Sequence, residues 1–284
     1  MVIRNDASLR GKCKAIAKKH GIMAQEVMQM YLFERFLARL EKSEYVDKFI
    51  LKGGLLISSL IGVENRTTMD MDATLQAISL DEESVSRMIS DICSIRCDDG
   101  VSFAFESVET IREDDDYGGL RAHIRSRFGR MDTPMKIDLT TGDAITPGVI
   151  EYPFPMMFDE GLLRVMSYPL ATCVAEKYEA LVKRGSLTTR ARDLYDIYRF
   201  VELYGDSLDW GSVSEAIGKT AEHRGSIELM GDFSRVCNEM LASTAIQDMW
   251  VKYVRENSFA VSISLEETLN AIRVVGEHYV LSFA

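Results

Sequence analysis

The sequence lacks the features that mark membrane and secreted proteins. No apolar run reaches the length of a membrane span, and the N-terminal residues show neither the apolar block nor the small-residue cleavage site of a signal peptide. Cysteine is scarce: the five residues are an odd number and are scattered, which favours a reduced interior over a disulfide framework. We therefore expect a cytoplasmic protein with no membrane contact.

Nitrogen and sulfur ligands for a metal are also few. The four histidines show no ligand spacing. Cys93 and Cys97 are four apart on an expected helix, with no second pair and no nearby histidine, whereas a structural zinc site needs four ligands. Internal repeats, coiled-coil heptads and low-complexity tracts are absent from the sequence. These absences argue against zinc, repeat and coiled-coil proteins.

What is present is an acidic, globular composition. Apolar residues make up 46% and charged residues 27% of the 284 residues, as in soluble domains, and the length suits one large domain or two ordinary ones. The formal net charge of −11 argues against indiscriminate coating of nucleic acid, although a local basic site remains compatible with it.

The most informative stretch runs from Phe49 to Leu75. A short apolar run leads to Gly53 and Gly54, a second apolar run follows, and the segment ends with Asp70 and Asp72. A glycine pair lets backbone amides approach a ligand, and a helix that begins there directs its positive end toward phosphate. Two carboxylates on one face of a strand suit magnesium. The order of these motifs predicts metal-assisted phosphoryl chemistry.

The pattern around this stretch predicts helices and then strands. Helical spacing of apolar residues covers residues 9–20, 24–40 and 80–95, whereas period-two alternation covers 101–105, 120–124 and 135–139, with an acidic, solvated hairpin turn at 112–119. Asp138 projects from the face opposite its apolar neighbours. A third carboxylate beside Asp70 and Asp72 suits two Mg²⁺ ions, one for the triphosphate and one for the attacking hydroxyl.

Four of the five prolines lie between residues 147 and 169 and predict a segment that crosses between two lobes. Beyond it the pattern is helical, over residues 169–185, 188–205, 210–223, 227–243, 244–257 and 265–283. We predict an α+β protein with a mixed-sheet N-terminal lobe at 1–160 and a C-terminal helical lobe at 161–284.

The helical lobe holds the densest positive cluster of the chain: Lys177, Lys183, Arg184, Arg190 and Arg192. Such side chains bind triphosphate. A solvated turn with ordinary surface ion pairs is an equally weighted alternative. Asp193, next to Arg192, either forms a surface pair or orients Lys177.

Four motifs follow one another along the chain: KGGLLIS…RTTMDMD, MKIDLTTGD, AEKYEALVKRG and RARDLYDIY. With these motifs in this order, the sequence resembles the AbiEii/AbiGii toxin family over nearly the whole chain. The family comprises nucleotidyltransferase toxins of type IV toxin–antitoxin and abortive-infection systems related to the mycobacterial MenT toxins. The resemblance implies a DNA-polymerase-β-like nucleotidyltransferase core. It also implies phage defence, an NTP substrate, a tRNA 3′ acceptor end as target, and a separately encoded AbiEi-type antitoxin as partner.

The resemblance also implies roles for individual residues. Gly53 and Gly54 match the glycines that contact nucleotide phosphates, and Asp70 and Asp72 match the metal carboxylates. Asp138 matches the third acidic position, Lys177 a lysine expected to contact phosphate, and Asp193 an essential aspartate. From the positive cluster we add Arg190 and Arg192 to the residues expected to bind the nucleotide.

The sequence departs from the family after the glycine pair, where many members carry Thr or Ser and this chain has Leu55. Ser58, one helical turn later, is the alternative hydroxyl for a phosphate. Two other functions stay open: a nucleotidyltransferase that modifies a protein or a small molecule, and an NTP-binding regulator without turnover.

Overall fold

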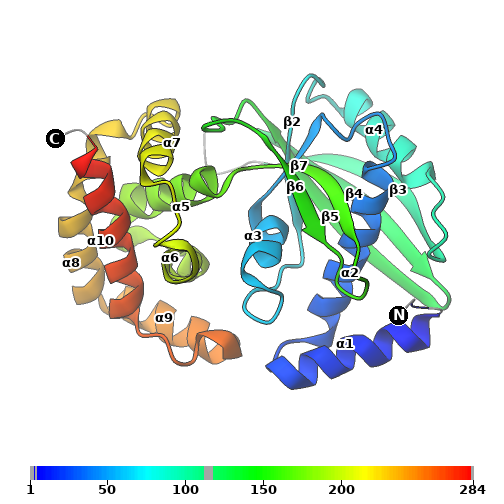
Figure 1. The fold of residues 1–284 in the computed structure, drawn as a ribbon, viewed down its shortest axis with the longest axis horizontal. Coiled ribbons are helices and arrows are strands. Elements are labelled where there is room, and N and C mark those ends of the chain that lie inside the picture. The colour runs from blue at the N-terminus through cyan, green and yellow to red at the C-terminus, as the bar shows by residue number, and fades with distance from the viewer. Residues whose placement is uncertain (1–2, 4, 112–117, 283–284) are drawn as a thin grey trace. The chain divides into compact units, whose positions relative to one another are not determined.

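The computed structural model describes residues 3, 5–111 and 118–282. Most of the expected acidic turn, residues 112–117, lies outside the described residues. The chain divides into two compact units, one of residues 1–143 and 149–167, the other of residues 144–148 and 168–284. The first unit contains the sheet, and the second is helical (Figure 1).

The first unit begins with the two expected helices, α1 (Asp6–His20) and α2 (Ala24–Leu40). Helix α1 starts earlier than the apolar spacing indicates because the Asn5 side chain accepts a hydrogen bond from the Ser8 N–H at 2.9 Å. Such a cap stabilises a helix by about 1 kcal/mol. Gly21 ends α1 in the left-handed conformation, with φ of 69°.

The informative stretch folds as strand β1 (Phe49–Lys52), helix α3 (Gly53–Ile61) and strand β2 (Met71–Leu75). Helix α4 (Glu82–Ser94) follows and is capped by Asp81, which accepts from the Ser84 N–H. The remaining strands of the unit are β3 (Val101–Ile111), β4 (Gly119–Phe128), β5 (Met131–Thr141), β6 (Ile150–Pro155) and β7 (Leu162–Ser167).

These strands form one mixed sheet in the order β3-β4-β5-β2-β1-β7-β6. The pairs β2–β5 and β1–β7 are parallel, and the other neighbouring pairs are antiparallel. The expected mixed sheet is thus confirmed. Because β2 pairs with β1 on one side and β5 on the other, the strand with the aspartates lies in the interior of the sheet.

The two faces of this sheet differ in polarity. Along β2 and β5, Met71, Ala73, Ile137 and Leu139 are fully buried on one face. Phe36 of α2 contacts this face, with its ring 6.4 Å from that of Phe49 and 5.9 Å from that of Phe103. Alternation therefore directs the charged residues of the same strands to the opposite face.

Residues 149–167 differ from the expected crossing segment, because they form the β6–β7 hairpin. Strand β6 is at the edge of the sheet, where prolines such as Pro153 and Pro155 are tolerated since an edge strand needs fewer ladder hydrogen bonds. Strand β7 pairs with β1, so it belongs to the first unit, whereas the sequence pattern predicts residues 161–167 as part of the helical lobe.

The second unit contains the helices expected beyond the prolines. They are α5 (Leu170–Arg184), α6 (Ala191–Tyr204), α7 (Trp210–His223), α8 (Phe233–Ala242), α9 (Thr244–Glu256) and α10 (Leu265–Leu281). The helix expected over 227–243 is divided into a 3₁₀ segment, Ile227–Asp232, and α8. Of the helices in the described part of the chain, none combines the length and apolar character needed to span a bilayer.

Candidate nucleotidyl-transfer site

The junction of β1 and α3 has no room for side chains. Gly53 has φ of +63°, and a Cβ atom on it would stand 2.1 Å from Asp72 Oδ2. A Cβ atom on Gly54 would stand 2.6 Å from Thr68 Oγ1. Both glycines are thus required for the start of α3 to pack against β2 and the loop before it. The first N–H groups of α3 emerge at this junction, where a helix attracts anions.

Asp72 is half-buried at this junction, and its Oδ2 accepts a hydrogen bond from the Gly54 N–H at 3.2 Å. Burial raises the pKa of Asp72, and the negative charges of Asp138 and Asp70 raise it further, whereas the Gly54 N–H and Lys52 lower it. Asp70 is exposed, immediately before β2. The negative charges of Asp70 and Asp138 therefore act on Asp72 at this junction.

Lys52 stands beside Asp72, since the two residues are opposite one another in the β1–β2 register. Its Nζ lies 2.8 Å from Asp143 Oδ2 and 2.7 Å from Thr140 Oγ1. The Thr140 hydroxyl in turn donates to Asp143 Oδ2 at 2.9 Å. Asp143 is therefore the ion-pair partner of a lysine next to the glycine pair.

Asp138 is opposite Asp72 in the β2–β5 register, as a third carboxylate requires. Both of its oxygens, however, accept hydrogen bonds from Arg121 of β4: Nε donates at 2.6 Å and Nη2 at 2.7 Å. Within the described residues, no group of three or more His, Cys, Asp or Glu side chains is arranged to hold a metal ion. The structure thus differs from the expected three-carboxylate metal centre at Asp138, because the Arg121 guanidinium forms an ion pair with this carboxylate.

Asp70 and Asp72 remain as oxygen donors suited to a hard divalent cation. Hard cations prefer carboxylate oxygens, and magnesium is commonly bound by one or two carboxylates together with substrate phosphates. Burial raises the pKa of Asp72, and the charges of Asp138 and Asp70 raise it further, so a bound cation would favour its ionised form. The residues present therefore fit a magnesium ion bound with a nucleotide.

In the second unit, Lys177 of α5 is enclosed by two aspartates of α6. Its Nζ lies 2.5 Å from Asp193 Oδ1 and 2.8 Å from Asp196 Oδ2. Asp196 has no exposed side-chain surface, and Asp193 is 11% exposed. Arg190 approaches Asp193 at 3.7 Å, whereas Arg192 is exposed. The structure thus brings together Lys177, Asp193 and Arg190 of the predicted set.

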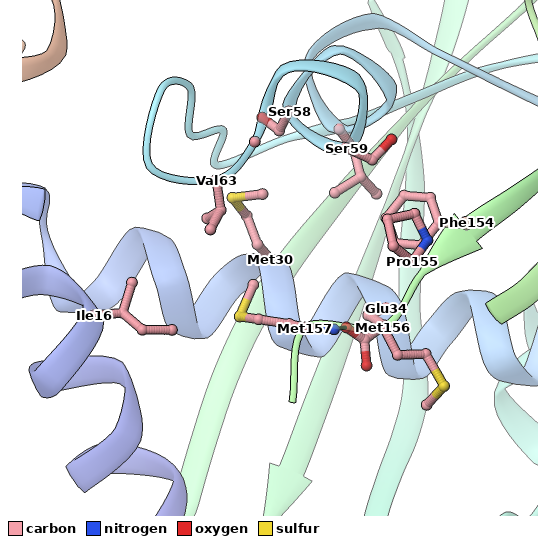
Figure 2. A pocket seen from close by; sticks show the side chains of 12 residues that line it. Ile16, Met30, Glu34, Ser58, Ser59, Val63, Phe154, Pro155, Met156 and Met157 are labelled. Carbon is pink, nitrogen blue, oxygen red and sulfur yellow. Dashed lines mark hydrogen bonds between the residues drawn. The ribbon is translucent and has the colours of Figure 1, made fainter. Parts of the chain in front are cut away.

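Ser58 is 1% exposed, and its hydroxyl has no hydrogen-bond partner in the described part of the chain. It lines a pocket of about 180 Å³ together with mostly apolar residues, among them Met30 of α2, Phe154 of β6 and Met157, which follows β6 (Figure 2). A phosphate contact requires exposure that this side chain lacks. We therefore expect that Ser58 does not replace the hydroxyl missing at Leu55.

Sequence reasoning missed Lys52, Arg121, Asp143 and Asp196 as parts of these charged groups. Lys52 directly precedes the glycine pair, and that position was the available signal for it. Arg121 alternates with apolar residues on its strand, which indicates its face of the sheet but not its partner. The pairing of Arg121 with Asp138 depends on the β4–β5 register, which the sequence leaves open.

Comparison with known proteins defines the class of this fold. The chain is similar to a Helicobacter pylori structure described as a candidate nucleotidyltransferase, with 16% identity and a TM-score of 0.54, over 92% of this chain and 98% of that one. It is also similar to JHP933 from Helicobacter pylori, with 15% identity and a TM-score of 0.53, over 91% and 94% of the two chains. The fold is therefore that of the nucleotidyltransferases. A search of curated proteins finds no match.

Residues 35–271 match the model of the nucleotidyl transferase AbiEii toxin family of type IV toxin–antitoxin systems. The chain belongs to this family, as its motifs indicate. It is thus a nucleotidyltransferase toxin. Membership implies an NTP substrate and an antitoxin partner.

Proposed function

We propose that this toxin is a Mg²⁺-dependent nucleotidyltransferase that moves nucleotides from an NTP to the hydroxyl at the 3′ acceptor end of tRNA, with release of pyrophosphate. A blocked acceptor end cannot be aminoacylated, so translation and growth stop. The observation that carries the proposal is the contact of Asp72 with the glycine pair, because it places a carboxylate at a helix start, the kind of position where anions bind.

In this proposal the N–H groups at the start of α3 bind the triphosphate. They have no intrahelical partners, and the helix dipole favours negative charge at this end. Gly53 and Gly54 keep the approach open, since a Cβ on either would displace Asp72 or Thr68. Asp70 and Asp72 would hold Mg²⁺ against the phosphates. The bound ion would neutralise the triphosphate and activate the acceptor hydroxyl.

The second unit contributes cationic groups. Lys177 binds phosphate as a point charge, and Asp193 and Asp196 hold its ammonium in place. Arg190 and Arg192 are further cationic groups of this unit that would bind nucleotide or RNA. This role is proposed on the basis of the family motifs and the Lys177 ion pairs.

The tRNA acceptor is proposed from the resemblance to the MenT toxins. We further propose that the protein acts in the cytoplasm, in phage defence, and is neutralised by an AbiEi-type antitoxin. A protein or a small molecule as acceptor is the second candidate, because the carboxylates and the glycine pair would activate any hydroxyl equally well. An NTP-binding regulator without turnover is disfavoured by the retained, unbalanced charge around Asp72.

The test uses purified protein with each of the four α-labelled NTPs, total tRNA, and either Mg²⁺ or EDTA. We expect label in tRNA with Mg²⁺ only, and no label with Asp72→Asn. Asp98→Asn is the matched control, because Asp98 is exposed on the same unit. Label in protein alone would favour the second candidate. NTP binding without any labelled product would favour the regulator.

A further inference from the structure

Four charged residues lie side by side on the polar face of the sheet. The register pairs Lys52 of β1 with Asp72 of β2, Asp72 with Asp138 of β5, and Asp138 with Arg121 of β4. Neighbouring strands are about 4.8 Å apart, so residues at one register position present their side chains together. The row therefore consists of two neighbouring carboxylates with a cation at each end.

Arg121 is held firmly in this row. Its Nε and Nη2 donate to the two oxygens of Asp138 in a bidentate pair, with the Arg121 side chain 27% and the Asp138 side chain 16% exposed. Bidentate arginine–carboxylate pairs are among the strongest polar contacts in proteins. The pKa of Arg121 is raised, chiefly by the hydrogen bond to Asp138, with Asp138, Asp70 and Glu109 adding negative charge. Arg121 thus stands among the carboxylates of the candidate site.

The charges around the glycine pair leave room for one divalent ion. Arg121 balances Asp138, and Lys52 balances Asp143. Asp70 and Asp72 are then the two carboxylates that remain for a Mg²⁺ ion. A second ion at Asp138 would have to separate a half-buried ion pair and leave a guanidinium without its partner, which is unfavourable.

We propose that the protein itself holds a single divalent ion, on Asp70 and Asp72, and that Arg121, anchored by Asp138, takes the place of a second ion at that carboxylate. This inference rests on the proposed function. It assigns Asp138 a positioning role: it is the anchor of Arg121 and not a third metal ligand. It differs from the two-ion arrangement that three carboxylates suggest from sequence alone.

The test counts bound ions without turnover. Mn²⁺ is titrated into the nucleotide-free protein, and free Mn²⁺ is followed by electron paramagnetic resonance. We expect one bound Mn²⁺ per wild-type chain, none with Asp72→Asn, and two with Arg121→Gln, which frees Asp138. Arg121→Lys retains a positive charge beside Asp138 and is expected to keep one ion.

The matched control is Arg125→Gln. Arg125 is on the same strand and projects from the same face as Arg121, but it pairs with Glu106 and Asp132. Its loss is expected to leave the count at one. Circular dichroism checks that each variant is folded.

Two ions or none on the wild-type chain would overturn the proposal, as would a count of one for folded Arg121→Gln. These results are independent of the labelling assay. One bound ion without tRNA labelling would reject the proposed acceptor and retain the proposal for Arg121.

Discussion

Asp72 lies so close to Gly53 that its carboxylate takes the place a side chain at position 53 would fill: a Cβ atom there would stand 2.1 Å from Oδ2. The same carboxylate oxygen accepts from the Gly54 N–H at 3.2 Å. The start of α3 and the aspartate of β2 are therefore one structural unit. A change at either position will disturb both the helix start and the carboxylate.

Gly53→Ala is expected to abolish nucleotidyl transfer and to lower stability. The methyl group forces Asp72 away, and alanine is strained at a φ of +63°. Strain of this kind costs roughly 1–3 kcal/mol. Labelling activity and thermal unfolding measure the two effects.

Gly11→Ala is the control, because Gly11 lies within α1 and a Cβ there meets nothing within 4 Å. It should be active and stabilised by up to about 1 kcal/mol. A fully active Gly53→Ala would contradict the role given to the junction.

Asp196→Asn is expected to destabilise the protein and to weaken NTP use. Asp196 is fully buried with its Oδ2 2.8 Å from Lys177 Nζ, so the substitution removes one of two charges that hold the ammonium. Breaking a buried pair costs about 3–5 kcal/mol. Chemical denaturation and KM for the NTP are the measurements. Asp248→Asn, on an exposed position of α9, should change neither quantity. Unaltered stability of Asp196→Asn would show that Asp193 alone holds Lys177.

The Arg39–Asp99 pair predicts a pH-dependent contribution to stability. Two hydrogen bonds of 2.8 Å join Arg39, 1% exposed, to Asp99. Burial raises the pKa of Asp99, but Arg39 outweighs it, so the pKa is lowered below its ordinary value. A carboxylate whose pKa is lowered in the folded state stabilises that state at pH values above its ordinary pKa. This stabilisation is lost as the pH falls through the folded-state pKa.

Asp99→Asn should therefore cost about 3 kcal/mol at pH 7, and the difference from wild type should shrink below about pH 4. Urea unfolding over a pH series measures this difference in the free energy of unfolding. The neighbouring Asp98→Asn, at an exposed position, should match wild type throughout. A difference that is independent of pH would indicate lost packing in place of lost charge.

Ser58→Ala is expected to leave NTP affinity unchanged. The hydroxyl is buried and has no hydrogen-bond partner among the described residues, so its removal should alter stability by less than about 1 kcal/mol or raise it. Calorimetric titration with NTP and thermal unfolding provide the two readings. A large loss of NTP affinity would restore Ser58 as a phosphate contact and require α3 to rearrange on binding.

Most elements of the fold could be predicted because their signals are local. Apolar spacing and a terminal glycine define α1, and the apolar run before Gly53 and Gly54 indicates β1 and α3. Strand β6 was not predicted, because its prolines hide a strand whose place at the sheet edge makes them tolerable, and its hairpin partner β7 was not predicted with it. Their assignment needs the partner strand, which is distant in sequence.

The sequence by itself determined which residues are present for chemistry: the glycine pair, Asp70, Asp72, Asp138 and Lys177, with alternation placing the strand carboxylates on a polar face. Tertiary structure alone decided their partners. Arg121 meets Asp138 across 17 residues and Lys52 meets Asp143 across 91. The physical reason is that alternation specifies a face of a strand, whereas the neighbouring side chain is set by the register between strands, which depends on packing of the whole sheet.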